Sequence, residues 1–198
     1  MRRKHAKLPI KTILDFVAEA GMLKNVSRSG WSVLGIKNME SVAEHSFRCA
    51  IIGYLLAHME DAAVDKVVLM ALFNDLQEAR ITDLHKMAQR YLNAEAAEEQ
   101  AYHEQIDALP VKIKEEMARL HKEYKAQKSR ESIIARDADI LECLIQAKEY
   151  YEQGNLKSDK FMCKAPQCLK TKSARSLWKA AKSQEICDWW LKLSQFKR

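Results

Sequence analysis

Apolar residues recur along most of the chain at the three- and four-residue spacing of an amphipathic helix. The pattern begins with Ile13, Leu14, Val17 and Ala20 and stops near Gly21. No segment alternates with the period of two that a half-buried strand requires. Only five Gly and three Pro occur in the chain, and this scarcity of helix breakers favours long helices. The pattern therefore predicts an all-α protein.

A second helix is predicted from a capping box, in which a serine is followed three residues later by glutamate, here Ser41 and Glu44. This helix carries Phe47, Ile51 and Leu55, together with Ala50 and Tyr54, on one face. Residues 25–38, which precede it, are expected to form a loop. The remaining predicted helices cover residues 61–79, 91–109, 111–128, 131–151 and 173–193.

The length of 198 residues suits a single domain covering residues 1–198, with residues 155–198 as a helical C-terminal extension. No run approaches the roughly 18 apolar residues of a membrane span, and no apolar segment follows the basic start. The five cysteines include no C-x-x-C pair. Cys49 and Cys143 fall within apolar helical patterns and are expected to be buried thiols. Together these features predict a cytoplasmic protein in a reducing compartment.

The formal net charge of +6 favours anionic ligands such as phosphates or nucleic acid, although a basic surface without a ligand is also common. A nucleic-acid hypothesis rests on the basic tail, residues 157–198, in which tryptophans alternate with lysines. Leu177, Trp178 and Trp189 fit packing in a core or a dimer better than base stacking. We therefore do not expect nucleic acid as a partner.

Three polar side chains occupy positions where apolar ones are expected. His45 begins the inner stripe that continues through Cys49 and Ile52, and Asp75 falls on the buried face of the third predicted helix. Asp139 lies inside a long apolar helix. A buried carboxylate is costly unless it is paired or bound to a metal. Each residue alone fits a hydrogen-bonded core histidine or an acid paired with arginine, and periodicity does not choose between Asp137 and Asp139. Brought together, an imidazole and two carboxylates would form a divalent-metal site.

Three segments in order resemble the motifs of HD-domain metal-dependent phosphohydrolases. Residues 41–50 (SVAEHSFRCA) resemble the first motif, and residues 72–84 (LFNDLQEARITDL) resemble the second, His-Asp-x-x-Glu followed by Gly-Asp. Residues 138–150 (ADILECLIQAKEY) are similar to the last motif, and residues 28–31 (RSGW) resemble a substrate loop of the 5'-deoxynucleotidase branch. The resemblance spans about residues 14–151 and implies an HD-domain helical bundle.

The resemblance implies a divalent-metal site formed by a histidine, a histidine–aspartate pair and a distant aspartate. The corresponding residues here are His45, Asn74, Asp75 and Asp139. Asp139 is selected over its neighbour because Glu142 and the residues after it then fall in register. The ion would be manganese, cobalt, zinc or a similar metal.

The resemblance also assigns roles around the metal. Glu78 would position or activate the attacking water, and Asp83 would assist departure of the nucleoside oxygen. Trp31 would contact the nucleoside, and Arg28 and Arg48 are candidates to neutralise phosphate charge.

Two positions depart from the family pattern. The histidine of the His-Asp pair is Asn74 here, and a neutral amide oxygen is a weaker ligand than imidazole for late first-row metals. Losing a residue that only supports a metal ligand typically lowers metal affinity or activity by roughly 10–100-fold. Losing the imidazole ligand itself is expected to cost at least as much. After Asp83 the chain continues with Leu84, His85 and Lys86 instead of the usual Thr-Pro. His85, Lys86 and Arg90 could contact phosphate or form a solvated basic face.

The sequence thus predicts a metal-dependent phosphohydrolase that acts on small nucleotides, as a 5'-nucleotidase of (deoxy)nucleoside monophosphates. The alternative is an HD-type pseudoenzyme, in which Asn74 marks a degenerate metal site that binds nucleotide or serves as a scaffold. The resemblance implies a homodimer.

Overall fold

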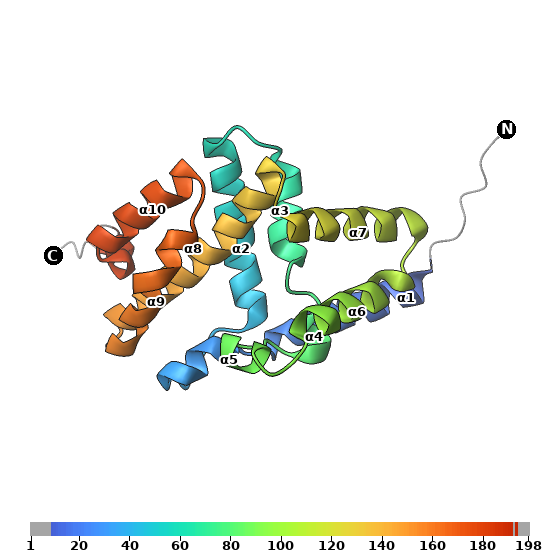
Figure 1. The fold of residues 1–198 in the computed structure, drawn as a ribbon, viewed down its shortest axis with the longest axis horizontal. Helices are drawn as coiled ribbons and strands as arrows, with labels where there is room; N and C mark the ends of the chain where they lie inside the picture. The colour runs from blue at the N-terminus through green and yellow to red at the C-terminus, as the bar shows by residue number, and fades with distance from the viewer. Residues whose placement is uncertain (1–8, 192, 194–198) are drawn as a thin grey trace.

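The computed structural model describes residues 9–191 and 193, and within them it contains helices, one isolated β-bridge between Ser27 and Ser41, and no strand (Figure 1). The all-α prediction is confirmed. The α-helices are α1 (Ile10–Gly21), α2 (Val42–Met59), α3 (Val64–Phe73), α4 (Glu78–Ile81), α5 (Lys86–Gln89), α6 (Ala94–Asp107), α7 (Val111–Ala126), α8 (Arg130–Glu152), α9 (Asp159–Lys164) and α10 (Lys172–Ser183). Short 3-10 helices are η1 (Met22–Lys24), η2 (Ser29–Leu34), η3 (Leu156–Ser158), η4 (Ala165–Cys168) and η5 (Ile186–Trp190).

The long helix α8 is the centre of the main core. It packs against α2, α3, α7 and α10, and in Figure 1 it crosses in front of α2. Ile134, Ala138, Leu141 and Leu144 of α8 are completely buried in this core. A second apolar cluster joins η1, the start of α2, α6 and α7, with Tyr102 and Ile106 buried at its centre. The main core therefore packs α2, α3 and α8 against one another, and the polar side chains of the site lie on or next to these helices.

The start of α2 agrees with the sequence prediction. The Ser41 side chain accepts a hydrogen bond from the Glu44 backbone N–H, and the Glu44 carboxylate accepts one from the Ser41 N–H. This reciprocal pair satisfies backbone donors at the helix N-terminus and fixes where the first turn begins. His45 follows directly and is therefore placed by a well-defined helix start.

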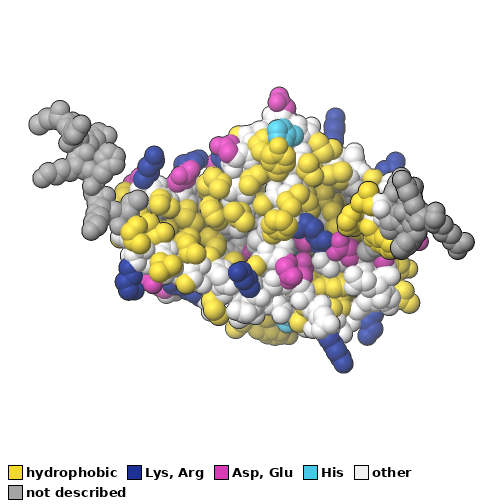
Figure 2. All heavy atoms as spheres, turned by 180° about the vertical axis from the view of Figure 1, so that it is seen from behind, with side chains coloured by type: hydrophobic (Ala, Val, Ile, Leu, Met, Phe, Trp, Pro, Cys, Tyr) yellow, Lys and Arg dark blue, Asp and Glu magenta, His cyan; other side chains and the backbone are white. Residues whose placement is uncertain are grey.

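The two sides of α2 differ in exposure. The side that carries His45, Cys49, Ile52 and Leu56 is buried. The apolar face noted in the sequence is exposed instead, with Phe47, Ile51, Tyr54 and Leu55 all open to solvent. Exposed apolar side chains also follow α1, at Ile10, Leu14 and Val17. Figure 2 shows hydrophobic side chains gathered in a broad band across the back of the molecule.

The third predicted helix, residues 61–79, is wrong at both ends. The α-helix begins at Val64 and ends at Phe73, and α4 starts only at Glu78. Between them the backbone tightens into three-residue turns, with Leu76 N–H bonded to Phe73 O and Glu78 N–H to Asp75 O. Asn and Asp side chains compete for hydrogen bonds with a helical backbone, and here the Asn74 amide binds the Asp75 carboxylate.

The last predicted helix, residues 173–193, is also shorter than expected. α10 ends at Ser183 because Gln184 adopts an extended conformation, and η5 follows. Trp178 packs into the main core, as the pattern suggested. Trp189 is 73% exposed and is therefore not a core residue. Residue 192 and residues 194–198 of the predicted basic tail lie outside the described residues.

Among the described residues, no helix is both long enough and apolar enough to cross a membrane.

Candidate functional site

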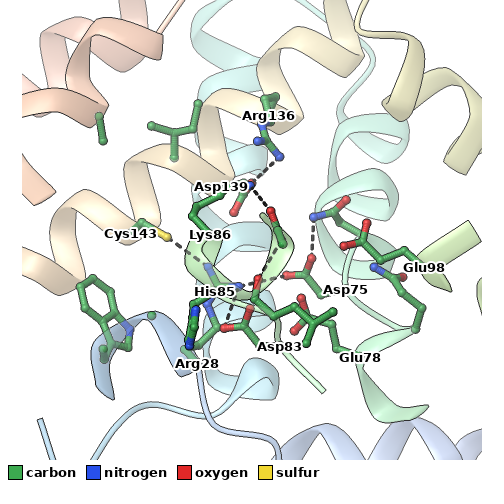
Figure 3. Close-up of a pocket in the computed structure, with 18 of the residues that line it drawn as sticks. Arg28, Asp75, Glu78, Asp83, His85, Lys86, Glu98, Arg136, Asp139 and Cys143 are labelled. Atoms are coloured by element: carbon green, nitrogen blue, oxygen red, sulfur yellow. Dashed lines mark hydrogen bonds and ion pairs between the residues drawn. The ribbon is translucent and has the colours of Figure 1, made fainter. Parts of the chain in front are cut away.

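A cavity of about 490 Å³ opens between the N-terminal part of the bundle and α8 (Figure 3). Its size is in the usual range for a small-molecule pocket. Its polar wall includes Arg28, Asp75, Glu78, Asp83 and Asp139. Its apolar wall is formed by Trp31, Val33, Leu84, Met87, Ile140, Phe161 and Ala165. A charged end beside an apolar end suits a ligand that has an anionic group attached to an aromatic body.

His45 lies behind two acids that line this cavity, and its side chain is 1% exposed. Its Nε2 atom is 3.4 Å from Asp75 Oδ2 and 3.2 Å from Asp139 Oδ1. The three residues come from α2, the turn after α3, and α8. The structure therefore brings together three of the four predicted metal ligands, although the motifs are far apart in sequence.

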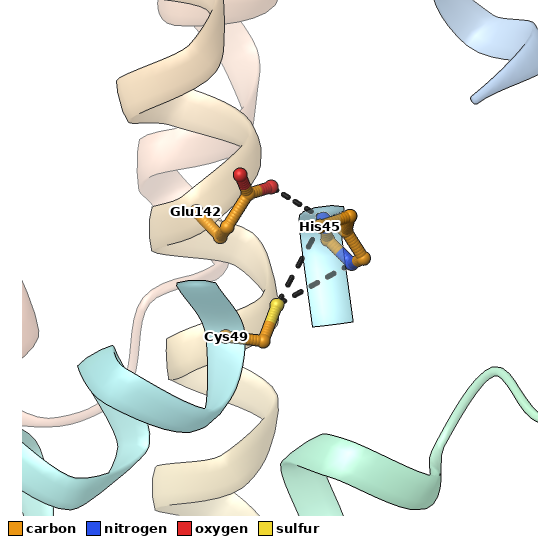
Figure 4. A group of neighbouring side chains, drawn as sticks. All are labelled: His45, Cys49 and Glu142. Carbon is orange, nitrogen blue, oxygen red and sulfur yellow. Dashed lines mark hydrogen bonds and ion pairs between the residues drawn. The ribbon is translucent and has the colours of Figure 1, made fainter. Parts of the chain in front are cut away.

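The opposite edge of the His45 ring is held by a carboxylate. Nδ1 of His45 pairs with Glu142 Oε2, and Cys49 Sγ lies 3.4 Å from Nε2 (Figure 4). Glu142 is itself completely buried and accepts a hydrogen bond of 2.9 Å from Arg48 Nε. A carboxylate on Nδ1 fixes the ring and keeps the proton on that nitrogen, which leaves Nε2 as a possible metal ligand.

Arg48 was predicted to bind substrate, but it is not among the residues that line the cavity. Its guanidinium forms ion pairs with Glu142 and Glu149 and donates a 2.6 Å hydrogen bond to Gln146 Oε1. These contacts place Arg48 behind the site, where it supports the carboxylate that orients His45.

The buried charges shift each other's proton affinity. Burial alone would raise the pKa of Asp139, but its hydrogen bond to His45 and the charge of Arg136 hold that pKa well below its usual value. Burial alone would lower the pKa of His45, but the neighbours Cys49, Asp139 and Asp75 outweigh it and raise that pKa well above its usual value. The two carboxylates beside Nε2 thus favour the protonated form of the imidazole. A divalent cation could replace that proton.

Asn74 lines the cavity at the position of the fourth predicted ligand. Its side-chain nitrogen donates a 2.7 Å hydrogen bond to Asp75 Oδ1, the oxygen that does not face His45. In this arrangement Asn74 orients the Asp75 carboxylate, and its own oxygen has no hydrogen bond to the other predicted ligands.

Glu78 and Asp83, the predicted catalytic acids, both line the cavity. Burial raises the pKa of Glu78 to about 10, with the Asp75 and Asp83 carboxylates adding to the rise. Glu78 Oε2 is buried without a hydrogen-bond partner in the structure. Asp83 accepts a 2.7 Å hydrogen bond from the Ser29 backbone N–H, which ties it to the RSGW segment.

Arg28 is the cation at the polar end of the cavity. Its Nη1 atom lies 3.9 Å from both Asp75 Oδ2 and Asp83 Oδ2, and Nη2 donates to Cys143 Sγ at 3.2 Å. Arg28 is therefore close enough to meet a phosphate bound at these acids. His85 and Lys86 also line the cavity, whereas Arg90 does not.

Trp31 lines the cavity but offers little surface to a ligand, because it is only 2% exposed. Its Nε1–H donates to Glu40 Oε1 at 2.9 Å, and its ring packs between Tyr150 and Phe161. Phe161 comes from α9, a segment without any motif signal, and lines the same cavity. The predicted nucleoside contact of Trp31 stays a prediction, and Phe161 is a second aromatic candidate that the sequence reasoning missed.

Other groups around the site were also missed. Arg136 pairs with Asp139 Oδ2 at 3.1 Å, and Tyr124 donates to the same oxygen at 3.5 Å. Cys143 lines the cavity one helical turn after Asp139 and is only half-buried, in contrast to the expected buried thiol. Its i+4 spacing from Asp139 was visible in the sequence and was the available signal.

The donor set fits a divalent metal. Imidazole nitrogen and carboxylate oxygens suit zinc, manganese and related ions. Within the described residues, two groups have potential ligand atoms that all lie within 4.8 Å of one another: His45, Cys49 and Glu142, and His45, Asp139 and Cys143. Glu78, which lines the same cavity as Asp139 and Cys143, has an unpartnered oxygen that is a further acceptor for a metal or water.

Comparisons with known proteins place the chain among related sequences. A family profile described as an HD domain matches residues 20–181. The chain is similar to the 5'-deoxynucleotidase HDDC2 of Bos taurus, with 31% identity over 147 residues, covering 73% of this chain and 71% of the relative. Its counterpart from Danio rerio is 33% identical over 144 residues, covering 71% and 70%.

A solved structure is similar as well. A conserved hypothetical protein from Pyrococcus furiosus superimposes with a TM-score of 0.72 at 36% identity, covering 86% of this chain and 97% of that one. The profile match continues past residue 154 and so includes α9 and most of α10.

Proposed function

The chain belongs to the HD-domain family, and from that premise we propose that it is a metal-dependent phosphohydrolase, a 5'-nucleotidase of (deoxy)nucleoside monophosphates. The observation that carries the proposal is the meeting of His45, Asp75 and Asp139 beside the cavity. Glu78 and Asp83 line the same cavity. The curated relatives, named 5'-deoxynucleotidases, support a nucleotide substrate.

We assign the metal to His45, Asp75 and Asp139, with Asn74 at the place of the family's second histidine. A bound divalent ion supplies Lewis acidity at the phosphoryl group and acidifies water. His45 must give up its Nε2 proton when the ion binds, and Glu142 keeps the ring in position through Nδ1. Positive charge at the site would also lower the pKa of Glu78 from its raised value.

The remaining residues act on the substrate. Glu78 orients the attacking water and accepts its proton, for which its unpartnered oxygen is available. Arg28 binds the phosphate oxygens, because its guanidinium lines the cavity and lies 3.9 Å from both Asp75 and Asp83. Asp83 is held against the RSGW segment by its hydrogen bond from the Ser29 N–H, and it assists departure of the 5'-oxygen of the nucleoside.

The apolar end of the cavity holds the nucleoside. Phe161, Ile140 and Met87 supply an apolar surface there, and Trp31 supports Phe161 from behind. Bases stack on aromatic rings with little sequence preference. A pocket of this kind therefore suits a range of bases.

The test is phosphate release from a panel of deoxynucleoside and ribonucleoside 5'-monophosphates with manganese, cobalt or zinc. Asp75→Ala should abolish metal binding and phosphate release while the helical circular dichroism is retained. Asp65→Ala removes an exposed carboxylate from the same region and should change neither. Metal retained by Asp75→Ala at wild-type stoichiometry would contradict the assignment of this ligand.

The competing hypothesis is a pseudoenzyme whose metal site is degenerate at Asn74. The amide that binds Asp75 in place of a metal is the observation that favours it. Under that hypothesis the wild-type protein binds nucleotide, or nothing, and releases no phosphate with any metal on the panel. Measured turnover that disappears in Asp75→Ala decides for the enzyme.

We also infer a homodimer, for which the uncharged face of α2 gives support. Phe47, Ile51, Tyr54 and Leu55 are exposed over more than two helical turns. Contiguous exposed apolar surface of this kind is typical of a contact between protein chains. Sedimentation equilibrium of the purified chain tests the oligomeric state.

The cysteines support the expected reducing, cytoplasmic location, which stays a prediction. Cys49, Cys143, Cys163 and Cys168 are free thiols in the structure.

A further inference from the structure

Cys143 is placed where a metal ligand could reach the same ion as His45 and Asp139. It projects from α8 into the cavity, one turn beyond Asp139 (Figure 3). Its Sγ atom, a nitrogen of His45 and a carboxylate oxygen of Asp139 all lie within 4.8 Å of one another. Zinc binds these atom types at about 2.0–2.3 Å, so donors to one ion lie at most about 4.6 Å apart. The three donors need only small movements to share a metal.

We propose that Cys143 is a fourth metal ligand in this protein and supplies the strong donor that Asn74 does not. The inference rests on the proposed function only in taking His45, Asp75 and Asp139 as the other ligands. A thiolate is a soft donor that favours zinc and cobalt over magnesium and manganese. One sulfur, one nitrogen and two carboxylates would therefore shift the site's preference towards zinc-like ions.

Cys49 is the other thiol near His45, but the geometry favours Cys143. Cys49 does not line the cavity. It lies near the His45 ring together with Glu142, on the side away from the cavity (Figure 4). Cys143 lines the cavity and groups with Asp139, which also lines it. An ion that enters from solvent and meets a phosphate must lie on the cavity side.

The sulfur of Cys143 already acts as a hydrogen-bond acceptor towards a cation. The Arg28 guanidinium donates a 3.2 Å hydrogen bond to Sγ and lies 3.9 Å from Asp75 Oδ2. A cation is thus already shared between this sulfur and a predicted metal ligand. When an ion binds, the thiol loses its proton to solvent and Arg28 must release the sulfur, because the two positive charges repel each other.

The experiment is a titration of the metal-free full-length protein with Co(II), followed by absorption spectroscopy. A thiolate bound to Co(II) gives an intense near-ultraviolet charge-transfer band that oxygen and nitrogen ligands lack. We expect the band in the wild type and in Cys168→Ser, which alters an exposed cysteine. Cys143→Ser should lose the band and bind zinc about 10–100-fold more weakly in competition with a chelator.

Two further variants make the result specific. Cys49→Ser should keep the band. Adding Asn74→His to Cys143→Ser should recover much of the zinc affinity without the band, because imidazole then supplies the missing donor. Serine retains a hydrogen-bond acceptor for Arg28, and circular dichroism verifies that each variant is folded.

The proposal is overturned if Co(II) binds to the wild type without the band, or if the band disappears in Cys49→Ser and persists in Cys143→Ser. Phosphate release with metal is measured separately, and the proposed function stands in those cases if the wild type releases phosphate. Absence of both metal binding and phosphate release in the wild type would instead overturn the proposed function and this inference together.

Discussion

Two carboxylates on opposite sides of α8, only two residues apart, occupy very different environments. Asp137 is completely buried and accepts hydrogen bonds from the Lys170 and Thr171 N–H groups and from Thr171 Oγ1. Asp139 borders the cavity and faces the His45 imidazole and the Arg136 guanidinium. The hydrogen bonds to the Asp137 carboxylate come mainly from backbone N–H groups, which the fold keeps in place. The imidazole beside Asp139 can instead exchange a proton for a metal. The kind of donor, more than burial, separates a structural acid from a site acid.

The strongest test of this comparison is to neutralise the acid at the cavity. Asp139→Asn keeps the shape of the side chain but removes an anionic ligand, so metal affinity and phosphate release should each fall by at least about 100-fold. Thermal stability should fall as well, because the ionised Asp139 carboxylate pairs with His45 and Arg136 in the folded protein, and these pairs hold its pKa low. Isothermal titration with zinc and a phosphate-release assay measure the first effect, and a thermal melt measures the second.

The converse change removes the structural acid. Asp137→Ala leaves three donors at the start of α10 unsatisfied and should lower the free energy of unfolding by about 2–4 kcal/mol. Urea denaturation measures the loss, and metal affinity at low temperature should be unchanged. If Asp137→Ala lost the metal with its stability intact, the ligand would be Asp137, and the motif register that selects Asp139 would be wrong.

A third acid, Glu40, accepts a hydrogen bond from the Trp31 indole N–H, its one side-chain donor among the described residues. Burial raises the pKa of Glu40 from 4.5 to about 7, and the nearby Glu142 carboxylate adds to the rise. The folded protein thus holds this proton more tightly than the unfolded chain does. The resulting stability is fully present below pH 4.5 and is lost as the pH rises through about 7.

Glu40→Gln should therefore reduce the loss of stability between about pH 5 and pH 8, by at most about 3 kcal/mol, with the indole hydrogen bond retained. Thermal melts of both proteins across this range measure the difference. Parallel pH profiles for wild type and variant would show that Glu40 is ionised in the folded protein throughout the range.

Much of the fold could be predicted because its signals are local. Apolar periodicity placed α6, α7 and α8 within a few residues of their observed bounds, and the Ser41–Glu44 capping box gave the start of α2. The end of α3 at Phe73 could not be foreseen, because residues 74–77 retain helical periodicity. The inner stripe predicted from His45 through Cys49 and Ile52 is buried, whereas periodicity did not show that the apolar side chains on the other face of α2 are exposed.

The site was predictable to the extent that motifs define it. Ordered motifs led to His45, Asp75 and Asp139, which the structure brings together from three elements. Contacts between distant segments could not be read from the sequence. Arg48 binds Glu142 instead of lining the cavity, and Phe161 packs against Trp31. Both contacts depend on how the helices pack.

The hydrogen bonds from Lys170 and Thr171 to Asp137 have a consequence for the order in which the protein matures. A chain is made from its N-terminus, and all the motif residues leave the ribosome before residue 171 does. Until then Asp137 has none of the backbone donors that satisfy it in the fold, and burying it in α8 is unfavourable. We therefore expect the helix that carries Asp139 and Cys143 to settle into place only after residues 170 and 171 are available. A nascent chain would then bind a metal ion only after the segment with Lys170 and Thr171, which follows the last motif, has been made.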